Sequence, residues 1–380
     1  MTVQEKKLRV AFLGGAFDSA VGRSHRIAIE MDQCFELVAG CFSRNDKKNR
    51  DSAIKYGVNP ERAHKNVHDL IAYESSNLDC VIILTPQDQH LEHLKICLEA
   101  GIPVICEKAL VCTSTEAEHI QRLLENRKGF LAVTYNYTGY PMVRELKNMV
   151  DSGMLGAIQQ IHIEMPQEGF ARLTTDGNPM TPQSWRLHDG SIPTISLDLG
   201  VHLHMMVRFL TGQKPEELVA ISASRGNFPE VADNVNCLVK YSNNIDCSIW
   251  YSKTAFGYRN GQRFRVFGDL GSAEWVQENP EYLSFADNSG GKYILDRTSN
   301  FSKVANQARY QRFKAGHPAG FIEAFANYYF DIAESLRSYL QDSKRQNHEF
   351  VFGVKESVEG LKMLEAISRS AVNKKWEVIK

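Results

Sequence analysis

Short apolar runs alternate with longer amphipathic segments along the first third of the chain. The run LRVAFL at residues 8–13 ends in Gly14-Gly15, and a helical pattern follows at 22–31. Further apolar runs predict buried strands at residues 35–43, 78–84, 102–106 and 130–133. Helical patterns lie between them at residues 47–56, 88–100 and 115–126. Because several of these strands are apolar throughout and alternate with helices, the pattern predicts a Rossmann-like, doubly wound parallel sheet covered on both faces.

The pattern changes after about residue 135. A helix at 142–152 and a strand at 157–165 precede a polar stretch rich in Gly and Pro, and another helix is predicted at 195–210. Five more strands, joined by hairpin-like turns, are predicted at residues 218–224, 234–241, 245–251, 263–267 and 273–276. Two last helices are predicted at residues 318–340 and 353–372. This order is typical of an α+β domain with a largely antiparallel open sheet and flanking helices.

The length of the chain agrees with two domains. It has 380 residues, whereas single hydrophobic cores rarely grow beyond about 250–300 residues. We therefore predict a first domain at residues 1–135 and a second domain at residues 136–380. The C-terminal helix could pack back on the first domain.

The charge balance and the cysteine spacing argue against some classes of binding partner. The 44 Lys and Arg nearly balance the 45 Asp and Glu, so no large basic field is available to attract a nucleic acid or an anionic membrane. The eight cysteines lie singly and without metal-ligand spacing, which predicts reduced core thiols and no metal site. There is no apolar leader pattern and no apolar stretch of about 18 residues. We expect a cytoplasmic protein that binds a small molecule.

The glycines after the first strand lie where a dinucleotide-binding fold makes its phosphate-binding turn. In such folds the pyrophosphate lies at the N-terminus of the first helix, where free backbone N–H groups and the helix dipole favour negative charge. Gly14, Gly15 and Gly22 could form this turn, although GGAFDSAVG places its third glycine later than the simple GxGxxG pattern. The alternative is that they only turn the chain. His25, near the start of the helix, could help to hold the pyrophosphate.

The end of the second strand bears on the choice between NAD and NADP. An acid at this point binds the ribose hydroxyls of NAD, and a cation favours the 2′-phosphate of NADP. The residues here are Ser43 and Arg44, and no acid lies at the tip. The sequence therefore favours NADP over NAD, unless Arg44 is only a solvated loop residue.

Four segments resemble the glucose-fructose oxidoreductase/inositol dehydrogenase (Gfo/Idh/MocA) family in their order and spacing. They are TPQDQH at residues 85–90, AGIPVICEKA at 100–109, the Trp185-Arg186 dipeptide, and DLGVH at 198–202. The chain departs from the family pattern at Ala109, where the family has proline. GYPMV at 139–143 and GHPAGFIEAFAN at 316–327 resemble a subgroup of sugar and cyclitol dehydrogenases.

The resemblance implies a role for each matching residue. The implied catalytic residues are Lys108, Asp198 and His202. The implied cofactor-binding residues are Gly14, Gly15, Gly22, Ser43, Arg44, Thr85, Pro86, His90, Glu107, Lys108, Trp185 and Arg186. The candidate substrate-binding residues are Lys108, Tyr137, Asp198, His202 and His317.

Oxidation of a secondary alcohol requires a base within hydrogen-bond reach of its hydroxyl proton. Histidine, with an ordinary pKa of about 6.5, supplies a neutral imidazole near neutral pH. On a regular α-helix, Asp198 and His202 are spaced i, i+4 and project from one face, whereas His204 faces elsewhere. By resemblance His202 is the base and Lys108 its electrostatic partner, and the reverse assignment stays open.

The sequence thus predicts an NAD(P)-dependent dehydrogenase that converts a hydroxyl of a sugar, sugar derivative or cyclitol to a ketone, or performs the reverse reaction. By family resemblance we expect a homodimer or homotetramer. Two alternatives remain. One is a glycosidase of the same fold that uses NAD for a transient oxidation, and the other is a nucleotide-sensing protein that has lost catalysis. The presence of Lys108, Asp198 and His202 argues against the sensor.

Overall fold

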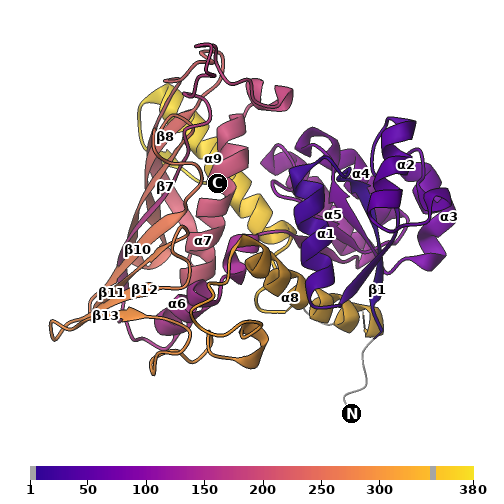
Figure 1. Ribbon diagram of the computed structural model, residues 1–380. Coiled ribbons are helices and arrows are strands. Elements are labelled where there is room, and N and C mark those ends of the chain that lie inside the picture. The colour runs from indigo at the N-terminus through magenta and orange to yellow at the C-terminus, as the bar shows by residue number, and fades with distance from the viewer. Residues whose placement is uncertain (1–5, 343–347) are drawn as a thin grey trace. The chain divides into compact units, whose positions relative to one another are not determined.

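The computed structural model describes residues 6–342 and 348–380, which form two compact units (Figure 1). The first unit contains the residues up to Gly139 together with Phe321–Val358. The second contains Tyr140–Gly320 and Glu359–Lys380. The helix α9 (Val354–Asn373) begins in the first unit and continues in the second.

The first unit is built on a five-stranded parallel sheet with the strand order β2-β1-β3-β4-β5. Its strands are β1 (Leu8–Gly14), β2 (Phe35–Cys41), β3 (Cys80–Leu84), β4 (Val104–Cys106) and β5 (Leu131–Val133). Its helices are α1 (Ala20–Met31), α2 (Asp46–Lys55), α3 (Val67–Glu74), α4 (His90–Glu99), α5 (Ser114–Arg127) and α8 (Phe321–Gln341). All five residues of β3 are buried, as expected for a central parallel strand. The predicted Rossmann sheet is confirmed.

Helix α8 belongs to the first unit although it lies far along the chain. Its Tyr328 hydroxyl donates to the Val133 carbonyl at 2.7 Å and accepts from the Phe352 N–H at 3.1 Å. The Asn327 side chain donates to the Gly139 carbonyl at 2.8 Å. The described residues of 321–358, which are 321–342 and 348–358, therefore complete this unit, whereas the sequence pattern alone grouped them with the segment after residue 135.

The second unit is built on a nine-stranded sheet with the order β13-β12-β11-β10-β6-β9-β8-β7-β14. Its strands are β6 (Ile158–Pro166), β7 (Pro215–Ala223), β8 (Asn234–Tyr241), β9 (Ile245–Ser252), β10 (Arg263–Gly268), β11 (Gly271–Val276), β12 (Leu283–Asp287), β13 (Lys292–Leu295) and β14 (Glu377–Val378). The β6–β9 pair is parallel, and the other pairs are antiparallel. The prediction of a largely antiparallel sheet is confirmed.

Side chains alternate between the two faces of this sheet. In β8 the buried residues are Val235, Cys237, Val239 and Tyr241, and the residues between them face outward. Figure 1 shows the helices α6 (Pro141–Asp151), α7 (Val201–Thr211) and α9 along one face of the sheet. Period-2 alternation is expected of a sheet with one packed face. Among the helices of residues 6–342 and 348–380, none is a candidate membrane span.

Candidate active site

The glycine turn after β1 brings two stretches of main chain into close contact. Gly14 and Gly15 have φ of +86° and +69°, a conformation that favours glycine. A Cβ on Gly22 would lie 2.2 Å from the Gly15 carbonyl oxygen, so this position also requires glycine. Ser19 caps α1 by accepting from the Gly22 N–H at 3.3 Å. The close backbone approach at the start of a helix has the form of a dinucleotide cradle.

The loop after β2 is fixed by side-chain caps. Asn49 accepts from the N–H groups of Phe42 and Ser43 at 2.7 and 3.3 Å. The Ser43 hydroxyl in turn accepts from the Asn45 N–H at 3.2 Å. The Arg44 side chain is exposed at this turn. An arginine on a fixed turn after the second strand suits recognition of a phosphate.

His90 connects the loops after β3 and β4. Its ring nitrogens contact the Thr85 carbonyl at 2.8 Å and the carbonyls of Ala109 and Leu110 at 3.0 and 3.1 Å. Burial lowers the pKa of His90 below its ordinary value, which favours the neutral ring. The peptide bond between Lys108 and Ala109 is cis. His90 therefore fixes the backbone on both sides of the predicted nucleotide loop, and its ring contacts protein carbonyls.

A buried chain of polar groups lies beside Lys108. The Glu107 carboxylate contacts the His25 Nε2 at 3.2 Å and accepts from the Thr134 hydroxyl at 2.5 Å. The other ring nitrogen of His25 contacts the Tyr329 hydroxyl at 2.5 Å. His25 is fully buried, so these contacts connect α1, the end of β4 and α8. The suggestion that His25 binds pyrophosphate receives no support from this geometry, because both of its nitrogens contact protein groups.

We predict a pH-dependent loss of stability for Glu107→Gln. Burial acts to raise the pKa of Glu107, but the His25 ring and, less strongly, Lys108 and Thr134 lower it below its ordinary 4.5. A depressed pKa stabilises the fold above the ordinary value, and this contribution is lost as the pH falls through the folded-state pKa. At pH 7 the variant should unfold with a free energy lower by about 1.5–3 kcal/mol, and the difference should shrink below pH 4.5.

Urea unfolding at several pH values measures this effect. Glu125→Gln is the control, because Glu125 is exposed and accepts from Gln121 on the surface of α5. Equal behaviour of the two variants at pH 7 would contradict a structural role for the Glu107 carboxylate.

Asp198 lies in a widened helical turn in the second unit. Residues Ser196–Gly200 form a π-helix, and the Val201 N–H donates to the Ser196 carbonyl five residues earlier. The predicted helix from residue 195 is present, but Ser196–Gly200 is π-helical and not α-helical, so the i, i+4 rule does not describe the relation of Asp198 to His202. π-Turns inside helices occur frequently at functional sites.

Two cations contact the same oxygen of Asp198. The Lys253 Nζ lies 2.6 Å from the Asp198 Oδ2, and one terminal nitrogen of Arg186 lies 3.3 Å from it. The Arg186 guanidinium lies 4.7 Å from the centre of the Trp185 ring. The structure thus brings Trp185, Arg186 and Asp198 together with Lys253, and the roles that the resemblance implies for the first three stay predictions. No motif in the sequence pointed to Lys253.

His202 and His204 lie on α7 and are buried. The His204 Nε2 lies 3.4 Å from a carboxylate oxygen of Glu359. His204 is therefore in ionic contact with Glu359 and not with Asp198. Gly200 packs against Leu364 and Tyr251, because a Cβ there would lie 2.9 Å from the flexible end of Leu364 and 3.3 Å from the Tyr251 ring. The DLGVH segment is therefore packed against α9 and β9 as well as held by its charged contacts.

The two remaining substrate candidates have different surroundings. Tyr137 is buried in the first unit and makes an edge-to-face contact with Phe321 at 6.3 Å. His317 is exposed in the second unit, and its carbonyl accepts from the buried Arg297 at 2.9 Å. Their roles stay predictions.

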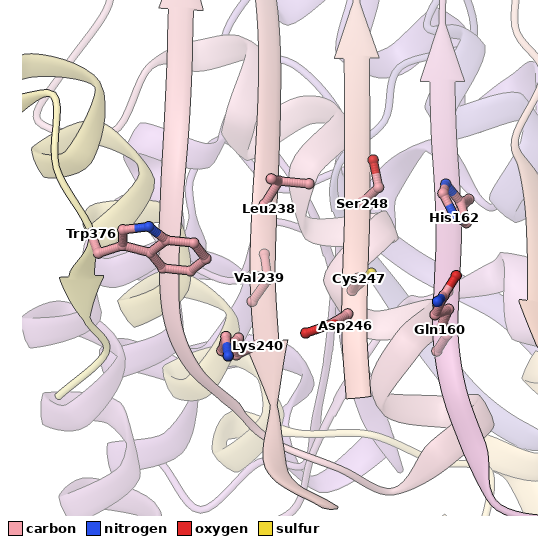
Figure 2. Close-up of a pocket in the computed structure, with 10 residues that line it drawn as sticks. Gln160, His162, Leu238, Val239, Lys240, Asp246, Cys247, Ser248 and Trp376 are labelled. Carbon is pink, nitrogen blue, oxygen red and sulfur yellow. The ribbon is translucent and has the colours of Figure 1, made fainter. Parts of the chain in front are cut away.

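A pocket on the outward face of the nine-stranded sheet is separate from these residues. Figure 2 shows Trp376 across β7, with Leu238 and Lys240 on the neighbouring strand β8 and His162 on β6. Among the described residues that line it, none is a predicted site residue. This pocket is therefore not our candidate active site.

A possible metal-binding group lies in the first unit. Asp331, Glu334 and His348 place ligand atoms within 4.8 Å of one another. Exposed acidic groups commonly gather without a metal, so we assign no ion there, and the predicted absence of a metal site stays a prediction.

The Rossmann sheet with its glycine turn after β1 agrees with a nucleotide-dependent oxidoreductase, and the family matches show this class of protein. Residues 8–135 match the family described as "Oxidoreductase family, NAD-binding Rossmann fold". Residues 143–274 match the "GFO/IDH/MocA C-terminal domain". The chain belongs to the GFO/IDH/MocA family, as its motifs predicted.

Relatives of known sequence or structure agree with this assignment. The chain is 30% identical over 377 residues to an uncharacterized oxidoreductase, YfiI, of Bacillus subtilis, covering 96% of this chain and 95% of that protein. It is 24% identical over 311 residues to a levoglucosan dehydrogenase of Pseudarthrobacter phenanthrenivorans, covering 74% and 76%. An Azotobacter vinelandii inositol dehydrogenase homolog, solved with NADH and myo-inositol, has a TM-score of 0.88 at 27% identity and 98% coverage of both chains. The prediction of a nicotinamide-nucleotide-dependent dehydrogenase is confirmed.

Proposed function

We propose that this enzyme oxidises a secondary hydroxyl of a sugar, sugar derivative or cyclitol to a ketone, or catalyses the reverse reduction, with NAD or NADP. The observation that carries the proposal is the Asp198 carboxylate, which contacts both Lys253 and Arg186. Asp198 precedes His202 by four residues in the sequence. A fixed carboxylate can accept a hydrogen bond from a substrate hydroxyl, and the neutral imidazole of His202 would accept the hydroxyl proton. Levoglucosan and inositol, named with two of the relatives, are both polyhydroxylated rings.

Each candidate residue has a separate role in the proposed reaction. The nicotinamide nucleotide, when bound, accepts or supplies the hydride, and Gly14, Gly15 and Gly22 leave room for its pyrophosphate. His202 takes the hydroxyl proton, and Asp198 orients the substrate. Lys108 stabilises the developing charge on the reacting oxygen. Chemical rescue of the two alanine variants tests the reverse assignment of His202 and Lys108.

An assay panel tests the proposed function. Sugars and cyclitols are offered with NAD and NADP separately, and the absorbance of the reduced cofactor is followed. Net reduction of the cofactor with at least one polyol supports a dehydrogenase. Cleavage of a glycoside without net cofactor change would instead support the glycosidase, and nucleotide binding without any turnover would support the sensor.

We further propose that Arg44 makes the enzyme prefer NADP. A hydrogen bond to a charged group contributes about 1.5–3 kcal/mol, so Arg44→Ala should raise the Kd for NADP by about tenfold or more and change that for NAD little. Fluorescence titration with both nucleotides measures the ratio. The control is Arg50→Ala, because Arg50 is also exposed and lies on the adjacent helix α2. Equal effects of Arg44→Ala on the two nucleotides would defeat the NADP preference.

We also propose a cytoplasmic homodimer or homotetramer. All eight cysteines are free thiols, which agrees with a reducing compartment. The outward face of the nine-stranded sheet leaves Ile221, Leu238 and Trp376 exposed, and Figure 2 shows the last two together. Exposed apolar groups on one face are typical of an association surface. The molar mass in solution, measured by light scattering, tests this assembly, and a monomeric mass would refute it.

A further inference from the structure

Lys253 is a buried cation at the end of β9. Its side chain is only 4% exposed, and its ammonium lies 2.6 Å from the Asp198 Oδ2. The ammonium also lies 5.2 Å from the centre of the Phe170 ring. A buried ammonium is strongly disfavoured without a counter-charge. Lys253 and Asp198 therefore depend on one another in the folded protein.

The main chain around Lys253 is fixed on both sides. Its N–H donates to the Asp233 carbonyl at 2.7 Å, and its carbonyl accepts from the Phe170 N–H at 2.8 Å. Asp233 is itself fully buried, and its carboxylate accepts from the N–H groups of Arg225 and Gly226 at 2.8 and 2.7 Å. The ammonium thus projects from a rigid part of the chain. Such support is what holds a functional group at a fixed place.

Arg186 contacts the same carboxylate from a more exposed position and at a longer distance. It lies on the 3-10 turn Ser184–Leu187, its side chain is 33% exposed, and its distance to the Asp198 Oδ2 is 3.3 Å. An exposed pair is weakened by solvent, whereas a buried one is not. Lys253 is therefore the closer and better shielded of these two cations. His202, on the same helical segment as Asp198, is the next titratable group along the chain.

We propose that Lys253 is a positioning residue of the active site, which acts through Asp198 by keeping this carboxylate ionised and aimed at a substrate hydroxyl. This inference rests on the proposed function. It predicts that the effect of removing Lys253 depends on the presence of Asp198. A residue needed only for local packing would show no such dependence.

A double-mutant cycle on the full chain tests the inference. The variants are Lys253→Met, Asp198→Asn and the combination of both, assayed for kcat and KM between pH 5 and 9 with a substrate found by the assay panel. We expect Lys253→Met to lower kcat by about tenfold to a hundredfold. In the Asp198→Asn background the same change should alter kcat by less than about threefold, because coupled residues are not additive. If the fold reductions in kcat of the two single variants multiply in the double variant, the proposal is overturned.

The pH profile gives a readout that packing alone would not move. Without the nearby ammonium, Asp198 should take up a proton at a higher pH. The acid limb of the kcat profile of Lys253→Met should therefore shift to higher pH, and Lys253→Arg should shift it back towards the wild type. An unshifted acid limb in Lys253→Met would contradict the proposal.

Lys147 supplies a matched control. It also pairs with an aspartate, with its Nζ 2.9 Å from the Asp151 Oδ2, and it lies 5.7 Å from the centre of the Phe209 ring. Lys147→Met should leave kcat and its pH profile unchanged. If Lys147→Met reproduces the kinetic change, the effect is not specific to Lys253 and the proposal fails.

Unfolding measurements separate this proposal from the proposed function. The same cycle measured by urea unfolding tests the Lys253–Asp198 pair without turnover, and we expect the double variant to be more stable than Asp198→Asn alone, since it does not keep a buried ammonium after the Asp198 carboxylate is removed. If the pair is coupled in stability but no polyol is oxidised, the proposed function fails. If polyols are oxidised but kcat shows no coupling, the positioning role fails. Lys253→Gln replaces Lys253→Met if the latter does not fold.

Discussion

Replacing His202 or Lys108 with alanine should lower turnover by about 10²- to 10⁴-fold, the range that a positioned acid–base group contributes. His202 is the predicted proton acceptor, and Lys108 is its predicted electrostatic partner. The Kd for the nucleotide should change only a few-fold, because the glycine cradle of the first unit stays intact. Initial rates with the best substrate of the panel and fluorescence titration of the nucleotide measure the two effects separately.

Controls of the same residue type lie outside the candidate site. His162 is on the outward face of the sheet, where its ring contacts Phe267, and Lys47 is 84% exposed on α2. Alanine at either position should leave turnover unchanged. Unchanged turnover in both His202→Ala and Lys108→Ala would defeat the assignment of these residues.

Chemical rescue distinguishes the two possible bases. Added imidazole should restore part of the turnover of His202→Ala if His202 accepts the proton. If Lys108 accepts the proton instead, added methylamine should restore part of the turnover of Lys108→Ala. Rescue by methylamine alone would reverse the assignment.

Local sequence patterns predicted the sheets well, because burial leaves short apolar runs in the parallel strands and a period of two in the half-buried antiparallel strands. The strand at Asn234–Tyr241 was predicted with its observed bounds, since its residues alternate strictly between buried and outward positions. The short strands β12, β13 and β14 were not predicted. In β13 three of the four residues are exposed, so burial leaves little periodic signal in the sequence.

The contacts that support the site could not be predicted, because they join residues far apart in the sequence. His25 and Tyr329 are 304 positions apart, and Asp198 and Lys253 are 55 apart. Lys253 follows an ordinary strand and belongs to no recognisable motif. The same reason applies to α8, whose amphipathic pattern predicts a helix but does not tell which unit it packs against. The π-turn at Asp198 was hidden because its residues also fit an α-helical pattern.

Replacing Gly22 with alanine should nearly abolish nucleotide binding. A Cβ at this position would lie 2.2 Å from the Gly15 carbonyl oxygen and 2.5 Å from the carbonyl carbon, so the turn itself must move. Alanine is otherwise favoured over glycine within a helix by about 1 kcal/mol. Any loss of stability or of nucleotide binding therefore comes from the contact between the new Cβ and the Gly15 carbonyl. Each displaced N–H to phosphate bond is worth about 1.5–3 kcal/mol, so the Kd should rise by at least about tenfold to a hundredfold.

Gly129→Ala is the control for this variant, and the comparison decides whether the glycines form a nucleotide cradle or only turn the chain. Gly129 also lies in the first unit, but a Cβ there would meet only leucine side chains at ordinary contact distance, Leu98 at 3.4 Å and Leu124 at 3.6 Å. Urea unfolding should show a loss of about 1–3 kcal/mol for Gly22→Ala from overpacking and little change for Gly129→Ala. If Gly22→Ala is destabilised in this way yet binds the nucleotide as tightly as Gly129→Ala, the turn serves the fold alone. Loss of binding that exceeds the loss of stability places the pyrophosphate at this turn.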